Sequence, residues 1–159
     1  MDSYWPVIFI VCAIALAVGP VMMMQPSQRI RRLSALRQAA AQKAMRVRLT
    51  TVTLPSGKTD VAVYSMPLPP TEAVRASWVL LQQDYQHDVN FYQQWEWDNK
   101  KHTAPAAQHA MLRELLSSFD SSIIGLEAGQ SSVGVYWCEK ALTIDDIETL
   151  LTRCKEALS

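Results

Sequence analysis

The feature that most constrains this chain is an unbroken apolar stretch from Trp5 to Met24, which contains no charged or amide side chain. As an α-helix, a stretch of this length spans about 30 Å, the thickness of the hydrocarbon core of a bilayer. We therefore expect a single transmembrane anchor at residues 1–24. A cleaved signal peptide is the main alternative, but the preceding Met-Asp-Ser-Tyr lacks the positive charge of such peptides.

Basic residues follow the apolar stretch and set the expected orientation. The segment 25–45 contains a run from Gln28 to about Met45 without Gly or Pro, which favours a juxtamembrane helix. Its arginines are Arg29, Arg31, Arg32 and Arg37. Because Lys and Arg concentrate on the cytoplasmic side of a transmembrane helix, we expect the N-terminus outside and the rest of the chain in the cytoplasm. Alternatively, these arginines face anionic lipid, where each contributes about 1 kcal/mol.

Residues 46–159 have the pattern of one small domain. Alternating β-branched residues separated by Gly-containing turns predict two hairpins. The expected strands are 46–54, 60–66, 122–127 and 132–138. A helix is expected from Pro105 to Phe119, and another from Thr143, with Asp146 at its capping-box position. Hairpins with amphipathic helices between and after them predict an α+β fold, with helices packed on a largely antiparallel sheet.

The stretch 71–98 is open to two interpretations. Its apolar residues recur every three or four positions and it lacks Gly and Pro, which favours a helix over much of its length. The run Trp78–Leu81 also fits a short central strand followed by an irregular aromatic segment.

Charge is distributed unevenly along the chain. Residues 1–59 carry eight basic side chains and one acidic side chain, whereas residues 60–159 carry seven basic and fourteen acidic ones. The acidic second part argues against general nucleic-acid binding. The three cysteines, Cys12, Cys138 and Cys154, form no redox or zinc pattern, so small buried thiols are the expected interpretation.

One spacing is compatible with metal binding. Asp84, His87 and Asp88 stand at i, i+3 and i+4, so on a helix they share a face, and an imidazole with two carboxylates can hold a divalent ion. No further ligand pattern accompanies them, and a solvated helix face is the stronger interpretation. We predict no cofactor, no metal and no catalytic residue.

Aromatic residues are concentrated between Trp78 and Trp97, where six of the chain's rings fall within twenty positions. A small domain fills its core with large rings, and we favour that interpretation. The alternative is a ring-lined groove for a partner, with Tyr92, Trp95 and Trp97 as the candidate partner-binding residues.

Several segments together resemble a known kind of protein. They are the uncharged N-terminal stretch, Pro26-Ser-Gln-Arg-Ile-Arg-Arg-Leu, Trp95-Glu-Trp97, and Leu126-Glu-Ala-Gly129 leading to Val133-Gly-Val-Tyr-Trp137. This combination resembles small single-pass inner-membrane proteins of Gram-negative bacteria that carry no assigned activity. The layout alone is similar to that of YajC, an accessory subunit of the bacterial preprotein translocase. The resemblance implies a bacterial inner-membrane location and a protein partner there.

The sequence therefore favours a non-enzymatic function. We expect a membrane-anchored cytoplasmic domain that acts as an interaction or accessory subunit of an inner-membrane complex. A ligand- or metal-binding domain, or an enzyme, that uses the face of Asp84, His87 and Asp88 with the neighbouring aromatics is the first alternative. Binding of anionic lipid through the basic segment is the second.

Overall fold

The computed structural model describes residues 4–23, 27–70 and 76–158. The chain divides into two units, residues 1–35 and residues 36–159. Two helices precede the sheet: α1 spans Trp5–Met23, and α2 spans Gln28–Gln42 and crosses the boundary between the units. The Oγ atom of Ser27 accepts a hydrogen bond from the backbone N–H of Ile30 at 3.3 Å, so Ser27 caps α2.

The N-terminal prediction needs correction. Within the described ranges, no helix is both long enough and apolar enough to cross a bilayer. The predicted transmembrane anchor at Trp5–Met24 is therefore wrong, and so are the single-pass inner-membrane location and the outward N-terminus that depended on it. Met24 lies outside the described residues.

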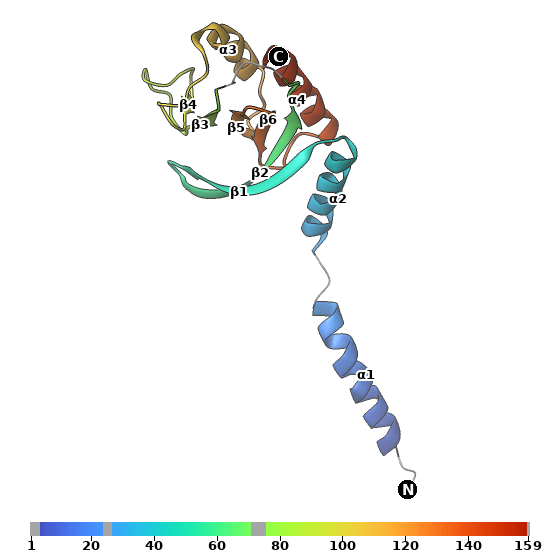
Figure 1. Ribbon diagram of the computed structural model, residues 1–159. Helices are drawn as coiled ribbons and strands as arrows, with labels where there is room; N and C mark the ends of the chain where they lie inside the picture. Colours follow the sequence, from blue (N-terminus) through green and yellow to red (C-terminus); the bar gives the residue numbers. More distant parts are fainter. Residues whose placement is uncertain (1–3, 24–26, 71–75, 159) are drawn as a thin grey trace. The chain divides into compact units, whose positions relative to one another are not determined.

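The second unit is built on one antiparallel sheet of six strands in the order β1-β2-β6-β5-β3-β4 (Figure 1). The strands are Arg46–Leu54 (β1), Gly57–Pro67 (β2), Trp78–Gln82 (β3), Trp95–Trp97 (β4), Ile123–Ala128 (β5) and Ser132–Trp137 (β6). Both predicted hairpins are present, as β1–β2 and β5–β6, and β2 joins them by pairing with β6. The α+β class fits this structure, although the transmembrane helix predicted with it does not.

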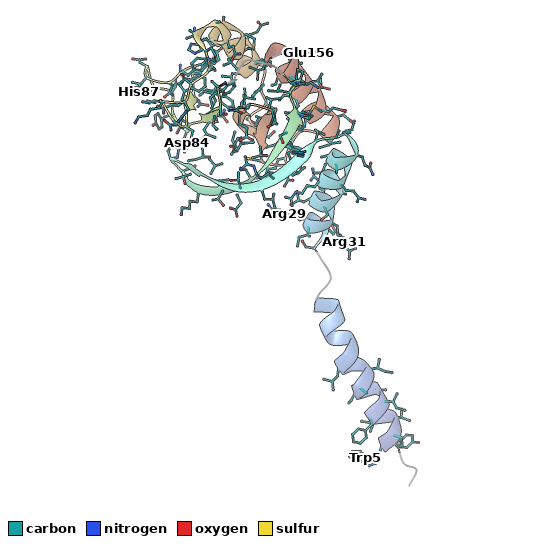
Figure 2. All side chains as sticks on the ribbon, in the orientation of Figure 1. Trp5, Arg29, Arg31, Asp84, His87 and Glu156 are labelled. Carbon is teal, nitrogen blue, oxygen red and sulfur yellow. The ribbon has the colours of Figure 1, made fainter. Side chains whose placement is uncertain are left out.

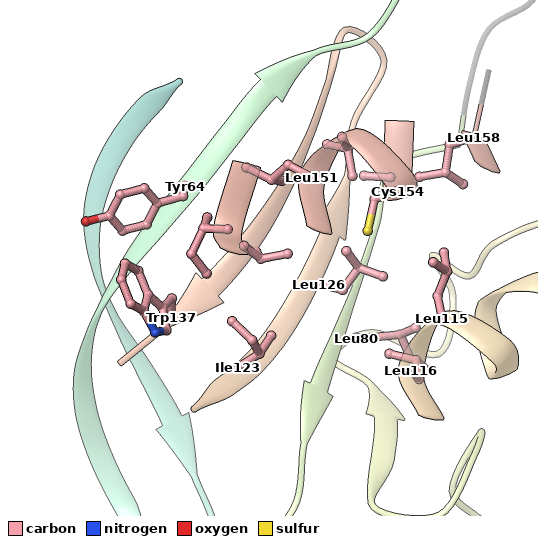
Figure 3. Close-up of a cluster of buried hydrophobic side chains, with 14 of the residues drawn as sticks. Tyr64, Leu80, Leu115, Leu116, Ile123, Leu126, Trp137, Leu151, Cys154 and Leu158 are labelled. Atoms are coloured by element: carbon pink, nitrogen blue, oxygen red, sulfur yellow. The ribbon is translucent and has the colours of Figure 1, made fainter. Parts of the chain in front are cut away.

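Helices cover one face of the sheet and enclose the main core (Figure 3). They are the 3-10 helix η1 (Ala106–Gln108), α3 (His109–Ser117) and α4 (Ile144–Leu158). α4 packs against β2 and β6, and its Leu151 and Cys154 are fully buried. On the sheet side, Trp137 is also fully buried, and its indole N–H donates a hydrogen bond to the carbonyl of Lys140 at 2.9 Å. The one polar group of the buried Trp137 ring therefore has a hydrogen-bond partner.

The start of α4 follows directly from the local sequence. The backbone N–H of Thr143 donates to the carboxylate of Asp146 at 2.8 Å, and the N–H of Asp146 donates back to the Thr143 hydroxyl at 3.3 Å. This is the predicted capping box. The hydrogen bonds from Thr143 lower the pKa of Asp146, because they favour the ionised carboxylate.

In its described part, the stretch 71–98 does not form the favoured helix; the alternative, a short strand at Trp78–Leu81 followed by an irregular aromatic segment, is confirmed. Residues 71–75 lie outside the described part, and the rest forms β3, an irregular loop and β4. Its apolar spacing matched a helix, but β3 sits between β5 and β4 and is buried on the helix-covered face through Trp78 and Leu80. Pairing with a strand that lies far along the chain therefore overrode the local pattern.

The end of α2 is tied to the sheet by a paired charge. The guanidinium of Arg37 donates to both carboxylate oxygens of Glu139, at 2.8 Å and 2.7 Å, and the Tyr64 hydroxyl donates to the same carboxylate at 2.8 Å. Glu139 has a φ of 55°, and Ala141 in the same loop has a φ of 62°. Neither is glycine, so this loop keeps a costly backbone conformation that presents Glu139 to Arg37.

We predict that Leu151→Ala destabilises the protein by about 2–5 kcal/mol, because it leaves a cavity between α4 and the sheet. Urea unfolding of the full chain measures this change. Arg153→Ala, at an exposed position on the same helix, is the control and should change the free energy of unfolding by less than about 0.5 kcal/mol. Equal effects of the two substitutions would contradict the packing of α4 described above.

Burial also predicts a loss of stability in alkali. Desolvation raises the pKa of the Cys154 thiol from 9.0 to about 12. A raised folded-state pKa means that the unfolded chain loses its proton first, so the stabilisation is complete below about pH 9 and falls as the pH rises towards 12. One thiol adds a slope of about 1.4 kcal/mol per pH unit.

The slope can be assigned to Cys154 by comparison with Cys154→Ala. That variant should start less stable, because it loses the sulfur's packing, but its unfolding free energy should fall less steeply between pH 9 and 12. Parallel curves for the two proteins would show that the thiol is not buried in its neutral form.

Candidate binding cleft

The face of the sheet opposite the helices carries a second charged network. Arg48 on β1 donates to both oxygens of the Glu127 carboxylate on β5, at 3.2 Å and 3.0 Å. The Tyr136 hydroxyl on β6 donates to the same carboxylate at 2.6 Å. Because β2 and β6 lie between β1 and β5, Arg48 can reach Glu127 only if the sheet curves strongly. We call this side of the sheet the concave face; the curved ribbon of β1 and β2 is visible in Figure 1.

Two glycines make room for the network. A Cβ atom at Gly125 would lie 2.8 Å from the ring of Tyr136, and one at Gly134 would lie 3.1 Å from a carboxylate oxygen of Glu127. The Tyr136 ring therefore packs directly on the backbone of Gly125, and the Glu127 side chain packs directly on the backbone of Gly134. Burial and the hydrogen bond to Glu127 raise the pKa of Tyr136, so its hydroxyl stays a proton donor.

An open cleft of about 500 Å³ lies at the margin of the concave face. The described residues that line it are Ser77, Trp78, Val79, Asp98, Asn99, His102, Glu127, Ala128, Gly129 and Ser132. Strand pairing places the carboxylates of this cleft. Val79 pairs with Glu127 on one side, and its carbonyl accepts the backbone N–H of Asp98 at 3.0 Å on the other. Asp98, which directly follows β4, thus forms one row with Val79 on β3 and Glu127 on β5, and side chains in a row share a face.

A smaller cleft of about 200 Å³ adjoins the first and shares Trp78, Ala128 and Gly129 with it. Its other walls are Leu68, Ala76, Pro105, Gln108 and Leu158. The two clefts therefore meet at the start of β3 and the end of β5. Mostly apolar concavities with a few convergent polar groups are the usual form of binding sites.

The polar groups of the larger cleft differ in how they are paired. Glu127 is engaged by Arg48 and Tyr136. Among the described residues, the side chains of Asp98 and His102 make no hydrogen bond or ion pair, and both are exposed. They are therefore the groups that can bind a ligand without first breaking an internal contact.

The predicted metal residues do not come together. Asp84, His87 and Asp88 are exposed in the irregular loop between β3 and β4 (Figure 2), so the shared helix face is not formed. The His87 Nδ1 atom accepts the backbone N–H of Val89 at 3.2 Å instead. No group of three His, Cys, Asp or Glu within residues 4–23, 27–70 and 76–158 could hold a metal ion.

The predicted partner-binding aromatics contribute mainly to packing. Trp95 is 4% exposed and stacks edge-on against Phe119, with ring centroids 5.8 Å apart. Trp97 is half-buried between Trp78 and Phe91, at 5.6 Å and 4.8 Å. The third candidate, Tyr92, is also half-buried, and its hydroxyl accepts a hydrogen bond from the side chain of its neighbour along the chain.

The predicted lipid-facing arginines fall into two groups. Arg29, Arg31 and Arg32 are exposed on α2, and Figure 2 shows the first two. Arg37 is paired with Glu139 and is therefore part of the fold.

Neither described cysteine of the second unit is a reactive thiolate. Burial raises the pKa of Cys138 as well as that of Cys154, which keeps both thiols protonated and poorly nucleophilic.

Sequence reasoning missed the cleft residues Asp98, His102 and Glu127. The available signal was Glu127 within an otherwise apolar strand, since a charged residue there needs a partner. Its partner Arg48 and its neighbour Asp98 come from other strands, and only the strand order reveals them.

Comparison of the chain with protein-family models, with curated proteins and with solved structures found no match in any of the three. The geometry of the cleft is therefore the basis for inferring function.

The glycine beneath Tyr136 gives a direct test of the concave face. We predict that Gly125→Ala destabilises the protein by about 1–3 kcal/mol, because the new methyl group must push the Tyr136 ring off the sheet. Thermal unfolding checks this, and near-ultraviolet circular dichroism should report the displaced ring. Gly129→Ala, where the nearest atom to an added Cβ lies at 3.7 Å, is the matched control and should be nearly neutral.

Proposed function

We propose that the second unit, residues 36–159, is a non-enzymatic binding domain that holds an extended segment of a partner protein in the cleft beside Val79. The observation that carries the proposal is the cleft itself: about 500 Å³ of open space, lined by polar side chains of which Asp98 and His102 are unengaged within the described part of the chain.

The form of the cleft favours a peptide segment. The larger cleft adjoins a smaller one, and the two share Trp78, so neighbouring side chains of one segment can be held together. The cleft also lies where β4, an edge strand of only three residues, ends. An edge position leaves room for a second chain to run alongside the sheet.

Selection of peptides from a random displayed library on the full-length chain tests the proposal. The matched pair of variants is Ser77→Trp, which fills the cleft from an exposed lining position, and Ser121→Trp, which makes the same change at an exposed position that is not part of its lining. We expect a family of related peptides that binds the native chain and Ser121→Trp but loses at least tenfold in affinity for Ser77→Trp.

Unfolding curves of both variants establish that any loss of binding is not a loss of folding. If the selection yields no related peptides, or if Ser77→Trp binds them as well as the native chain does, the cleft is not a peptide site.

A further inference from the structure

We infer that the cleft recognises a basic side chain, Lys or Arg, of the bound segment, with the side chain lying over Val79 between the carboxylates of Asp98 and Glu127. This inference rests on the proposed function and specifies the chemistry of the partner. Glu127 belongs to β5 on one side of β3, and Asp98 directly follows β4 on the other side, at the level of Val79. Two strand spacings place their Cα atoms about 10 Å apart.

The separation of Asp98 and Glu127 suits a Lys or Arg side chain, which has a charged end and an apolar methylene stem. Val79 is half-buried and forms the floor of the row, so the methylene groups of a Lys or Arg side chain can cover it. The charged head then lies within reach of carboxylates on both sides. Hydrogen bonds between a cation and a carboxylate are about twice as strong as neutral ones, which makes this the strongest contact that the cleft can offer.

The charge of the cleft points the same way. Asp98 and Glu127 are its acidic lining residues, and no Lys or Arg occurs among the described residues that line it. Arg48 approaches Glu127 from the concave face and, with Tyr136, fixes the carboxylate in place. Asp98 has no such partner within the described ranges, so it supplies the uncompensated negative charge that a basic side chain neutralises.

The test uses the strongest peptide from the selection and a counterpart in which each Arg is replaced by citrulline and each Lys by norleucine. Calorimetric titration of the full-length chain should show a loss of at least tenfold for the neutral counterpart. Asp98→Asn should remove most of that difference, because the neutral amide no longer distinguishes the two peptides. Asp84→Asn, which makes the same charge change in the exposed β3–β4 loop, is the control and should keep it.

The outcomes separate this inference from the proposed function. Peptides that depend on an open cleft, but contain no basic residue or bind Asp98→Asn unchanged, would overturn the inference and leave the binding domain standing. If spermidine bound with the same dependence on Asp98 while no peptide did, the site would be one for small polyamines, and the assignment to a partner's side chain would fail.

Discussion

The fold of the second unit depends on the pairing of β2 with β6, which joins an early hairpin to a late one at the centre of the sheet. α4 packs on these two strands. Each strand also carries one tyrosine: Tyr64 of β2 lies on the face that the helices cover, and Tyr136 of β6 lies on the concave face. Tyr64 binds Glu139 beside the helices, and Tyr136 binds Glu127 on the concave face. On both faces an arginine from an earlier segment pairs with the same carboxylate. Each half-buried glutamate is therefore compensated by one arginine and one tyrosine.

Acidic residues that are paired with an arginine stabilise the fold, whereas Asp98 does not take part in such a pair within the described residues. Glu139 and Glu127 each hold distant segments of the chain together, and each is compensated by an arginine. Asp98 stands at the end of β4 with its backbone fixed but its carboxylate uncommitted within the described residues. Since the fold does not need the charge of Asp98, that charge is available for an external contact.

Local signals in the sequence predicted the local parts of the fold. The β1–β2 and β5–β6 hairpins and the capping box of α4 depend on neighbouring residues, and all were foreseeable. The segment from Trp78 to Trp97 left a helix and a strand both open, because its rings follow a helical period while the backbone of β3 pairs with β5. The cleft was hidden, since Asp98 and Glu127 become neighbours only through β3, which lies between them. The apolar N-terminal stretch gave the strongest signal and led to a wrong membrane assignment.

The strand order also dictates when each part of the sheet can form. The β1–β2 hairpin emerges first during synthesis, but β2 has no partner for its inner edge until β6 is complete near the end of the chain. Until then the β2 backbone from Ala62 to Pro67 is an open edge that other chains could extend. Contacts between such distant segments carry a high loop-closure cost, so we expect the pairing of β2 with β6 to come late in folding.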